Sequence, residues 1–217
     1  MNLLFILTFF PPLLILLYVI KSDKFPEPIS CILKIFTLGI FLTIPAGYLN
    51  QILIFNSEED LTYLAGLTEE SLKFFAFLFF VSKSFNFNER MDAIVYGVLI
   101  SLGFATLENY QYVYFLFPDV DSHTVAIFRV FTAIPLHAFC GVIMGYYFGL
   151  HYFDHKPHYL FLAFFIPVIT HAIYNFSGDI ALQFLIIIIL SFQVKKLHRQ
   201  FIKHQSNKKT EAEIKLL

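Results

Sequence analysis

Long apolar runs alternate with short polar connections along almost the whole chain. A membrane-spanning helix needs roughly 20 mainly apolar residues. Runs that meet or approach this length occur at about 3–20, 30–54, 60–82, 92–117, 124–150, 159–176 and 179–194. The pattern therefore predicts an all-α fold, a polytopic membrane helix bundle with about seven transmembrane helices.

The composition supports this class. Hydrophobic residues make up 58% of the chain and charged residues only 14%, which is outside the range of soluble globular proteins. The first run has no basic n-region and no cleavage site, so we expect a retained span. We predict one membrane-embedded domain, 1–195, followed by a basic tail, 196–217. Cys31 and Cys140 lie in apolar runs without metal-type spacing and are expected to be small buried hydrophobes.

The connections alternate in charge. Lys and Arg mark the first, third and fifth connections and the tail, whereas "NSEED" (56–60), "PDVDSH" (118–123) and "SGD" (177–179) contain none. Because short basic loops stay in the cytoplasm, we expect the N-terminus outside, the tail in the cytoplasm and the segment 60–82 across the membrane. The tail is interpreted as a cytoplasmic anchor, and binding of anionic lipid or RNA is the weaker alternative.

Five charged residues are not explained by this topology. All but two of the 15 Lys and Arg residues lie in or beside the basic connections, and the exceptions are Lys73 and Arg129. Glu69, Glu70 and Glu108 lie well inside apolar runs. A charge near the bilayer centre costs at least about 2.5–3.5 kcal/mol, so each needs a partner or a function. Lys73 follows the glutamates by four and three residues, and one cation can therefore serve both.

Two histidines and an asparagine fall at a similar depth. Counted from the outer helix ends, His137 and His171 agree with Glu70 and Glu108 within roughly 12 Å at 1.5 Å per residue, and Asn175 lies one turn further out on the face of His171. We therefore predict one polar cavity in the outer half of the bilayer. Arg129 lies nearer the outer end, and snorkelling to the surface is its alternative.

Small residues and prolines accompany the histidines. Gly141, Gly145 and Gly149 continue the face of the first histidine at four-residue steps, a pattern that admits a neighbouring helix backbone. Pro135 and Pro167 precede the two histidines, and each removes a backbone hydrogen bond and can kink its helix.

These groups suit a peptide hydrolase without a nucleophilic side chain. With neutral histidines the five charges sum to −1, and uptake of one proton cancels them. Glu69 or Glu70 can act as a general base on water. His171 and Asn175, one turn apart, can present two donors to the oxyanion.

Two residues remain to orient the water, Glu108 and His137. A zinc site is the alternative chemistry, but HExxH is absent, the ligands would come from four helices and Lys73 would compete for the carboxylates. We therefore predict no metal and no cofactor. Ser71 and Ser101 lack a histidine positioned by sequence, and G-x-S-x-G is absent, so a serine nucleophile is not supported.

Four motifs in this order resemble the PrsW family of intramembrane glutamic-type endopeptidases. They are "EESLK" (69–73), "GFATLEN" (103–109), "HAFCGVIMGYYFG" (137–149) and "HAIYN" (171–175), and the similarity runs from about residue 20 to 195, including "FPEP" at 25–28. The family is similar to the type II CAAX prenyl endopeptidases, whose sites hold a Glu-Glu pair, F-x-x-x-H and H-x-x-x-N/D. Here Phe104 precedes Glu108, where that relative has His.

The resemblance implies a bacterial, Gram-positive, multi-pass protease of the cell membrane. It implies the first (site-1) cut in a membrane-spanning anti-sigma factor on the outer side, in a stress response by regulated intramembrane proteolysis. Glu69 and Glu70 would be catalytic carboxylates, and His171 with Asn175 would bind the oxyanion and the substrate carbonyl. The departure at Glu108 leaves the water-orienting role open between it and His137. The implied partners are this substrate and the lipid bilayer, with no nucleic acid.

Two other functions remain open from the residues. A transporter or channel could use the Glu and His layer as a proton or cation site, although the two halves show no internal repeat. A non-catalytic scaffold or sensor could use the buried ions to fix the register of the bundle.

Overall fold

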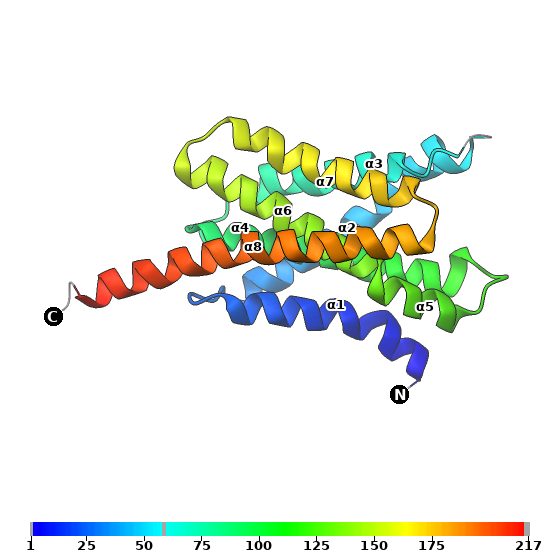
Figure 1. Cartoon of the computed structure of the whole chain (residues 1–217), viewed down its shortest axis with the longest axis horizontal. Coiled ribbons are helices and arrows are strands. Elements are labelled where there is room, and N and C mark those ends of the chain that lie inside the picture. Colours follow the sequence, from blue (N-terminus) through cyan, green and yellow to red (C-terminus); the bar gives the residue numbers. More distant parts are fainter. Residues whose placement is uncertain (1, 58–59, 215–217) are drawn as a thin grey trace.

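The computed structural model describes residues 2–57 and 60–214, with side chains as far as 207. Every regular element in this part of the chain is helical (Figure 1), which confirms the all-α prediction. The α-helices are α1 (Leu3–Ser22), α2 (Ile29–Asn50), α3 (Leu64–Ala76), α4 (Arg90–Gln111), α5 (Ser122–Phe131), α6 (Ala133–Asp154), α7 (His158–Phe176) and α8 (Ile180–Ile214). Three π-helical turns, η1 (Gln51–Phe55), η2 (Phe77–Val81) and η3 (Tyr112–Leu116), extend α2, α3 and α4.

Within residues 2–57 and 60–214, six helical segments are long and apolar enough to cross a membrane. They are Leu3–Ser22, Ile29–Phe55, Arg90–Leu116, Ser122–Asp154, His158–Phe176 and Ile180–Asn207, and they match six of the predicted runs. The remaining run, 60–82, contains α3 and η2 and packs against α2 and α7. The polytopic membrane bundle is confirmed, and the crossing of the third run remains a prediction.

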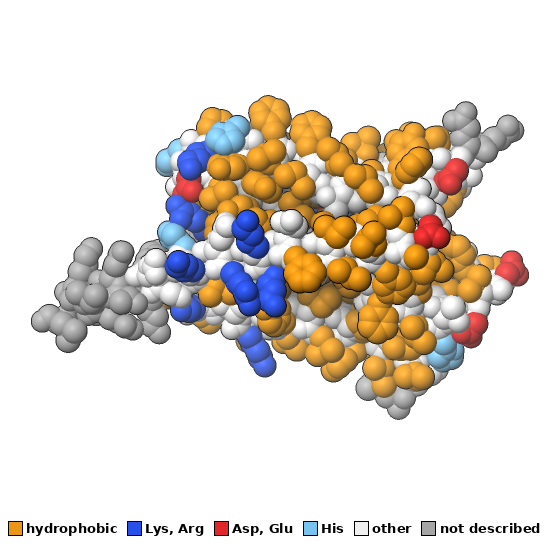
Figure 2. All heavy atoms as spheres, viewed as in Figure 1, with side chains coloured by type: hydrophobic (Ala, Val, Ile, Leu, Met, Phe, Trp, Pro, Cys, Tyr) orange, Lys and Arg blue, Asp and Glu red, His pale blue; other side chains and the backbone are white. Residues whose placement is uncertain are grey.

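Charged side chains are separated along the bundle axis. On the face shown in Figure 2, Lys and Arg gather toward the end where α8 emerges, most Asp and Glu lie at the opposite end, and hydrophobic side chains cover the middle. We call these the basic end and the acidic end. Positions 58 and 59 and the tail side chains from 208 onward, including the lysines at 208, 209 and 215, lie outside the described residues. The orientation of the two ends across the membrane stays a prediction from the loop charges.

Helix α4 forms the centre of the bundle and contacts α1, α2, α6 and α8. Its backbone approaches that of α6 closely, because a Cβ added at Gly141 would lie 2.7 Å from the carbonyl oxygen of Gly97. Gly145 meets the backbone at Ala93 in the same way. The small-residue face predicted for α6 is therefore confirmed, and α4 is the neighbour that it admits.

The predicted single helix over 124–150 is interrupted. Helix α5 ends at Phe131 and α6 begins at Ala133, and Thr132 between them has φ −126° and ψ −76°. Pro135 supplies the reason, because it has no N–H to donate and its ring would clash with the carbonyl four residues earlier, at Phe131.

Helix α3 has its polar face turned inward. Glu70 and Lys73 are fully buried, whereas Leu67 and Phe75 are each 46% exposed on the surface of the bundle. A surface helix of a soluble protein shows the reverse arrangement. This pattern fits a helix whose outer face meets lipid.

Helix α8 continues through the start of the predicted basic tail. Beyond the apolar run, His198 Nε2 lies 2.8 Å from Ser22 Oγ, and Gln205 Nε2 donates to Asp23 Oδ1 at 2.7 Å. Lys24 Nζ donates to Ser206 Oγ at 2.6 Å. The first part of the tail is thus a helix attached to the connection between α1 and α2.

Candidate active site

The charged residues singled out in the apolar runs meet in the interior of the bundle. Lys73 Nζ lies 2.7 Å from Glu70 Oε1 and 3.8 Å from Glu69 Oε2. The predicted sharing of one cation by both carboxylates is therefore present, with the closer contact to Glu70. The ammonium also lies 3.0 Å from His137 Nδ1 and 4.1 Å from the ring centroid of Phe104. These contacts connect α3 with α4 and α6.

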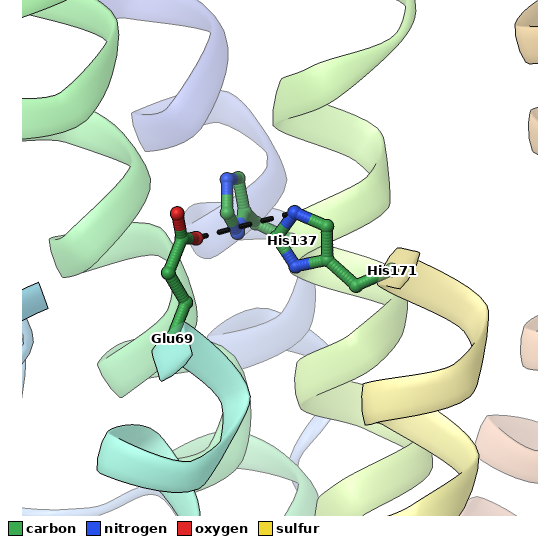
Figure 3. Close-up of side chains that lie close together, drawn as sticks. All are labelled: Glu69, His137 and His171. Atoms are coloured by element: carbon green, nitrogen blue, oxygen red, sulfur yellow. Dashed lines mark ion pairs between the residues drawn. The ribbon is translucent and has the colours of Figure 1, made fainter. Parts of the chain in front are cut away.

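His171 joins the same group from α7. Its Nδ1 lies 3.0 Å from Glu70 Oε1, and its Nε2 lies 4.0 Å from Glu69 Oε2. The rings of His171 and His137 stand edge to face with centroids 5.0 Å apart. Figure 3 shows the Glu69 carboxylate pointing toward both imidazoles. Within the described residues its buried Oε2 atom has no hydrogen-bond partner, so this oxygen is available to a water or a substrate.

Glu108 and Arg129 form the other side of the group. The guanidinium donates to Glu108 Oε2 at 2.6 Å, and the same oxygen lies 2.9 Å from His137 Nε2. Arg129 Nε donates to Asn109 Oδ1 at 2.8 Å, and its guanidinium carbon lies 4.0 Å from the ring centroid of Tyr112. Arg129 is only 7% exposed. It is paired inside the bundle and does not snorkel.

We call these seven residues the charge network: Glu69, Glu70, Lys73, Glu108, Arg129, His137 and His171. Its two strongest ion pairs are buried, and each contains a cation from the chain itself. Loss of such a cation leaves a buried carboxylate without a counter-charge, and this strongly destabilises the folded state. The network therefore holds Glu70 Oε1 and Glu108 Oε2 in ion pairs, whereas Glu69 Oε2 and Glu70 Oε2 have no hydrogen bond within the described residues.

A cavity of about 420 Å³ lies beside the network. It is lined by the predicted site residues Glu69, Glu108, Arg129, His137, His171 and Asn175, among largely apolar side chains. A neighbouring hollow of about 470 Å³ shares Tyr112, Phe117 and Asn175 with it and reaches Asp60 and Gly178 at the acidic end. Glu70 and Lys73 do not line this cavity. Of the two adjacent glutamates, the structure therefore exposes Glu69 to the cavity.

Asn175 lines both hollows, but its amide is hydrogen-bonded outside the network. Its Nδ2 donates to the carbonyl oxygen of Thr62 at 3.3 Å. Among the described residues no hydrogen bond joins it to His171 or Glu69. The predicted pairing of Asn175 with His171 as oxyanion donors remains a hypothesis.

Several residues that hold the network were not singled out from the sequence. Asn50 in α2 donates to Glu69 Oε1 at 3.2 Å, and its own Oδ1 accepts from Thr68 Oγ1 at 2.5 Å. Asn109 Nδ2 donates to the carbonyl oxygen of Thr8 at 2.8 Å. An amide in an apolar run also needs a partner, and this signal, which marked Asn175, is present at Asn50 and Asn109 as well.

Three of the residues come close enough to hold a metal ion. Donor atoms of Glu69, His137 and His171 lie within 4.8 Å of one another. Both nitrogens of His137 are engaged, however, one by Lys73 and the other by Glu108. A catalytic zinc ion takes three protein ligands. As arranged, the three residues offer two free donors, and so they do not fit a catalytic zinc site unless His137 gives up a partner.

Comparison with known proteins gives one consistent result. Residues 27–195 match the family described as "PrsW family intramembrane metalloprotease". A protein named Protease PrsW from Clostridioides difficile (strain 630) is 30% identical over 204 residues, which cover 88% of this chain and 85% of that protein. The proteins of the same name from Oceanobacillus iheyensis and Bacillus subtilis (strain 168) are 34% and 33% identical, each over 76% of this chain and 78% of the relative. No solved structure shows significant similarity.

The family match extends from the connection after α1 into α8, and so it includes every helix that contributes to the charge network. The curated relatives cover most of the chain and share one name. The helical membrane bundle and its buried glutamates and histidines agree with this match. The chain therefore belongs to the PrsW family and is a membrane protease.

Proposed function

We propose that this protein is an intramembrane endopeptidase that uses Glu69 to activate water. The observation that carries the proposal is the position of Glu69 Oε2, which has no hydrogen-bond partner and lies 4.0 Å from His171 Nε2. Both residues line the same cavity. A water molecule between these two atoms can contact both. Glu70 is assigned a positioning role, because Lys73 and His171 hold it outside the cavity.

The reaction follows from this geometry. Glu69 Oε2 accepts a proton from water while the water oxygen adds to the carbonyl carbon of the scissile peptide. Protonated His171 then donates Nδ1–H to Glu70 and Nε2–H to the oxyanion. Asn175 is the second donor: its Nδ2 leaves the carbonyl oxygen of Thr62 and donates to the oxyanion instead. Glu69 returns the proton to the leaving nitrogen, and the carbon–nitrogen bond breaks.

The remaining residues keep the charge of the site fixed. With neutral histidines, Glu69, Glu70 and Glu108 against Lys73 and Arg129 give a net charge of −1. Protonation of His171 brings the network to neutrality before the oxyanion forms. Glu108 and His137 also line the cavity. Because both nitrogens of His137 are engaged, Glu108 orients the water and His137 holds Glu108 in place.

The side of cleavage follows from the access route. The hollow next to the cavity reaches the acidic end, and the loop charges predict that this end faces outward. A peptide bond near the outer surface of the cell membrane is the substrate that can reach Glu69. We infer that the substrate is a single-span anti-sigma factor and that the protein makes its first cut, as the PrsW resemblance implies for a Gram-positive stress response.

Glu69→Gln tests the base. The protein is reconstituted with a tagged single-span anti-sigma factor, and cleavage is followed by gel and mass spectrometry. Loss of a general base should lower the rate by about 10²–10⁴ without unfolding the bundle. Asp121→Asn, an exposed carboxylate at the same end, is the matched control and should cleave at the parental rate. Parental cleavage by Glu69→Gln would remove Glu69 from catalysis, and cation flux lost in that variant would favour a transporter.

A metal-dependent reaction is the second candidate, favoured by the approach of Glu69, His137 and His171 and by the family description. A metal held by these residues would supply a Lewis acid for water and carbonyl. Dialysis against a strong chelator separates the two cases. If Glu69 activates water without a metal, the cleavage rate is unchanged after dialysis. Loss of cleavage that added zinc restores would establish the metal reaction.

A further inference from the structure

A second group of carboxylates, three of them buried and Glu27 half-buried, lies at the basic end, away from the candidate active site. It consists of Asp23 and Glu27 in the connection between α1 and α2, Glu89 at the N-cap of α4, and Asp92 in the first turn of α4. We call it the carboxylate cluster. Asp23 and Glu89 are each 8% exposed and Asp92 is 1% exposed. Oxygen atoms of these three residues lie within 4.8 Å of one another.

Hydrogen bonds from protein donors hold one carboxylate oxygen each of Asp92, Asp23 and Glu89. Asp92 Oδ2 accepts the backbone N–H groups of Asn88 and Glu89, each at 2.8 Å. Asp23 Oδ1 accepts Gln205 Nε2 at 2.7 Å, and the same amide nitrogen donates to Glu89 Oε1. These bonds set the direction of each carboxylate before any ligand is considered.

The second oxygens have no such partner. Asp23 Oδ2, Glu27 Oε2 and Asp92 Oδ1 are buried without a hydrogen bond in the described part of the chain. Among the described residues none of these three carboxylates has an ion pair with a lysine or arginine, and the nearby Arg90 is paired with Asp154. Burial and the neighbouring Asp23 raise the pKa of Glu27. Several carboxylates gathered in one buried place are unfavourable without a counter-charge.

Helix capping accounts for only part of this arrangement. Glu89 and Asp92 form a capping box at the start of α4, which uses Asp92 Oδ2. Capping does not use Asp92 Oδ1, and it gives Asp23 and Glu27 no reason to be there. Glu27 belongs to the motif "FPEP" (25–28), which is part of the family resemblance. The proposed catalytic reaction gives this motif no role.

We infer that the carboxylate cluster binds a hard divalent cation, Mg²⁺ or Ca²⁺. The candidate donors are all carboxylate oxygens, which these cations prefer over the nitrogen and sulfur ligands of zinc. The unpartnered oxygens supply the ligands, and the bonds from backbone N–H groups and Gln205 act as the second shell that orients them.

The cation would join three parts of the fold. Asp23 lies after α1, Asp92 lies in the first turn of α4, and Gln205 belongs to α8. Gln205 already touches both Asp23 and Glu89. A bound cation would therefore fasten the helical start of the tail to the membrane bundle at the basic end.

Terbium luminescence measures binding directly. The chain contains no Trp, and Tyr96, which contacts Glu27, is placed to sensitise a Tb³⁺ ion in the cluster. Chelator-stripped full-length protein in detergent is titrated with Tb³⁺, and Mg²⁺ and Ca²⁺ are then added as competitors. We expect saturable binding of one ion, displaced by at least one of the two cations. Asp92→Asn should weaken binding by at least tenfold, and Gln205→Ala by about tenfold or more.

Two variants locate the signal. Glu69→Gln removes a carboxylate of the charge network, and Asp121→Asn removes an exposed carboxylate at the acidic end. Both variants should bind Tb³⁺ with the affinity of the parent. Loss of the signal in Glu69→Gln, parental binding by Asp92→Asn, or no saturable binding by the parent would each overturn the inference.

Thermal unfolding provides a second readout. It uses the parent and other variants, and so it remains informative if Asp92→Asn folds poorly. Saturating Mg²⁺ or Ca²⁺ should raise the Tm of the parent and of Asp121→Asn, because a ligand that binds only the folded state stabilises it. Glu27→Gln should show a smaller rise. Equal shifts in the parent and in Glu27→Gln, or no shift in the parent, contradict the site.

Discussion

The charge network and the carboxylate cluster are both buried groups of acids, but their charges are compensated differently. In the network, Glu70 pairs with Lys73 at 2.7 Å and Glu108 pairs with Arg129 at 2.6 Å. In the cluster, Asp92 is held by backbone N–H groups instead. The network carries its own cations, whereas the donors that hold Asp92 and Asp23 in the cluster are oriented but uncharged.

This is the difference that we expect between a catalytic site and a site for an exchangeable ligand. A general base must regain the same charge state after each turnover, and cations supplied by the chain cannot diffuse away. The network accordingly keeps Glu69 Oε2 available beside fixed partners. Unpartnered oxygens on several residues, as in the cluster, instead suit an exchangeable ion. Four substitutions test this contrast.

The largest expected effect is on stability in the charge network. Lys73→Met leaves Glu70 buried without its closest cation, which should lower the free energy of unfolding by about 3–5 kcal/mol. Denaturant unfolding in mixed micelles, followed by far-UV circular dichroism, measures the loss. Adding Glu70→Gln to Lys73→Met should recover a large part of it. A single variant as stable as the parent would show that Lys73 does not compensate Glu70.

The next effect is on cleavage. His171→Ala removes the proposed main oxyanion donor and should lower kcat by about 10²–10³, with a smaller decrease for Asn175→Ala. Cleavage of the reconstituted substrate is measured under saturating conditions, and folding is checked by gel filtration. Ile173→Ala, an exposed position on the same helix, is the control. An equal or larger loss in Asn175→Ala would reverse the proposed order of the two donors.

The carboxylate cluster should respond in the opposite direction from Lys73→Met. In the presence of chelator, Asp92→Asn removes one negative charge and offers an amide donor to neighbouring oxygens, so stability should rise by about 1–3 kcal/mol. Unfolding curves with chelator and with excess Mg²⁺ or Ca²⁺ measure this, and the advantage should shrink or reverse when the cation is present. Destabilisation under both conditions would mean that capping by Asp92 outweighs charge repulsion.

The smallest effect concerns the attachment of α8. Gln205→Ala removes the amide that donates to Asp23 and Glu89 and should cost about 0.5–1.5 kcal/mol. Hydrogen exchange should increase in the segment that follows the apolar part of α8 while the charge network and cleavage stay parental. Unchanged exchange there would indicate that other contacts, such as the bond between Ser22 and His198, are sufficient.

Much of the fold could be predicted because its signal is local. Most lipid-facing and buried positions of the helices are apolar, so run length alone located the helical segments. Two details escaped this criterion. The break at Thr132 depends on the steric demand of Pro135, which composition does not reveal, and the packed position of α3 depends on partners for its ions.

The sequence by itself determined the membrane class of this protein, its helical segments and the ionisable residues that need partners. Burial of a charge is costly wherever a residue lies in an apolar run, so no neighbour had to be known. Only the tertiary structure decided that Glu69 faces the cavity while Glu70 is held by Lys73 and His171. It also decided that Asp23 and Asp92 share one buried place. Pairing depends on separations of a few ångströms between helices that are distant in the chain, and a one-dimensional pattern does not contain those distances.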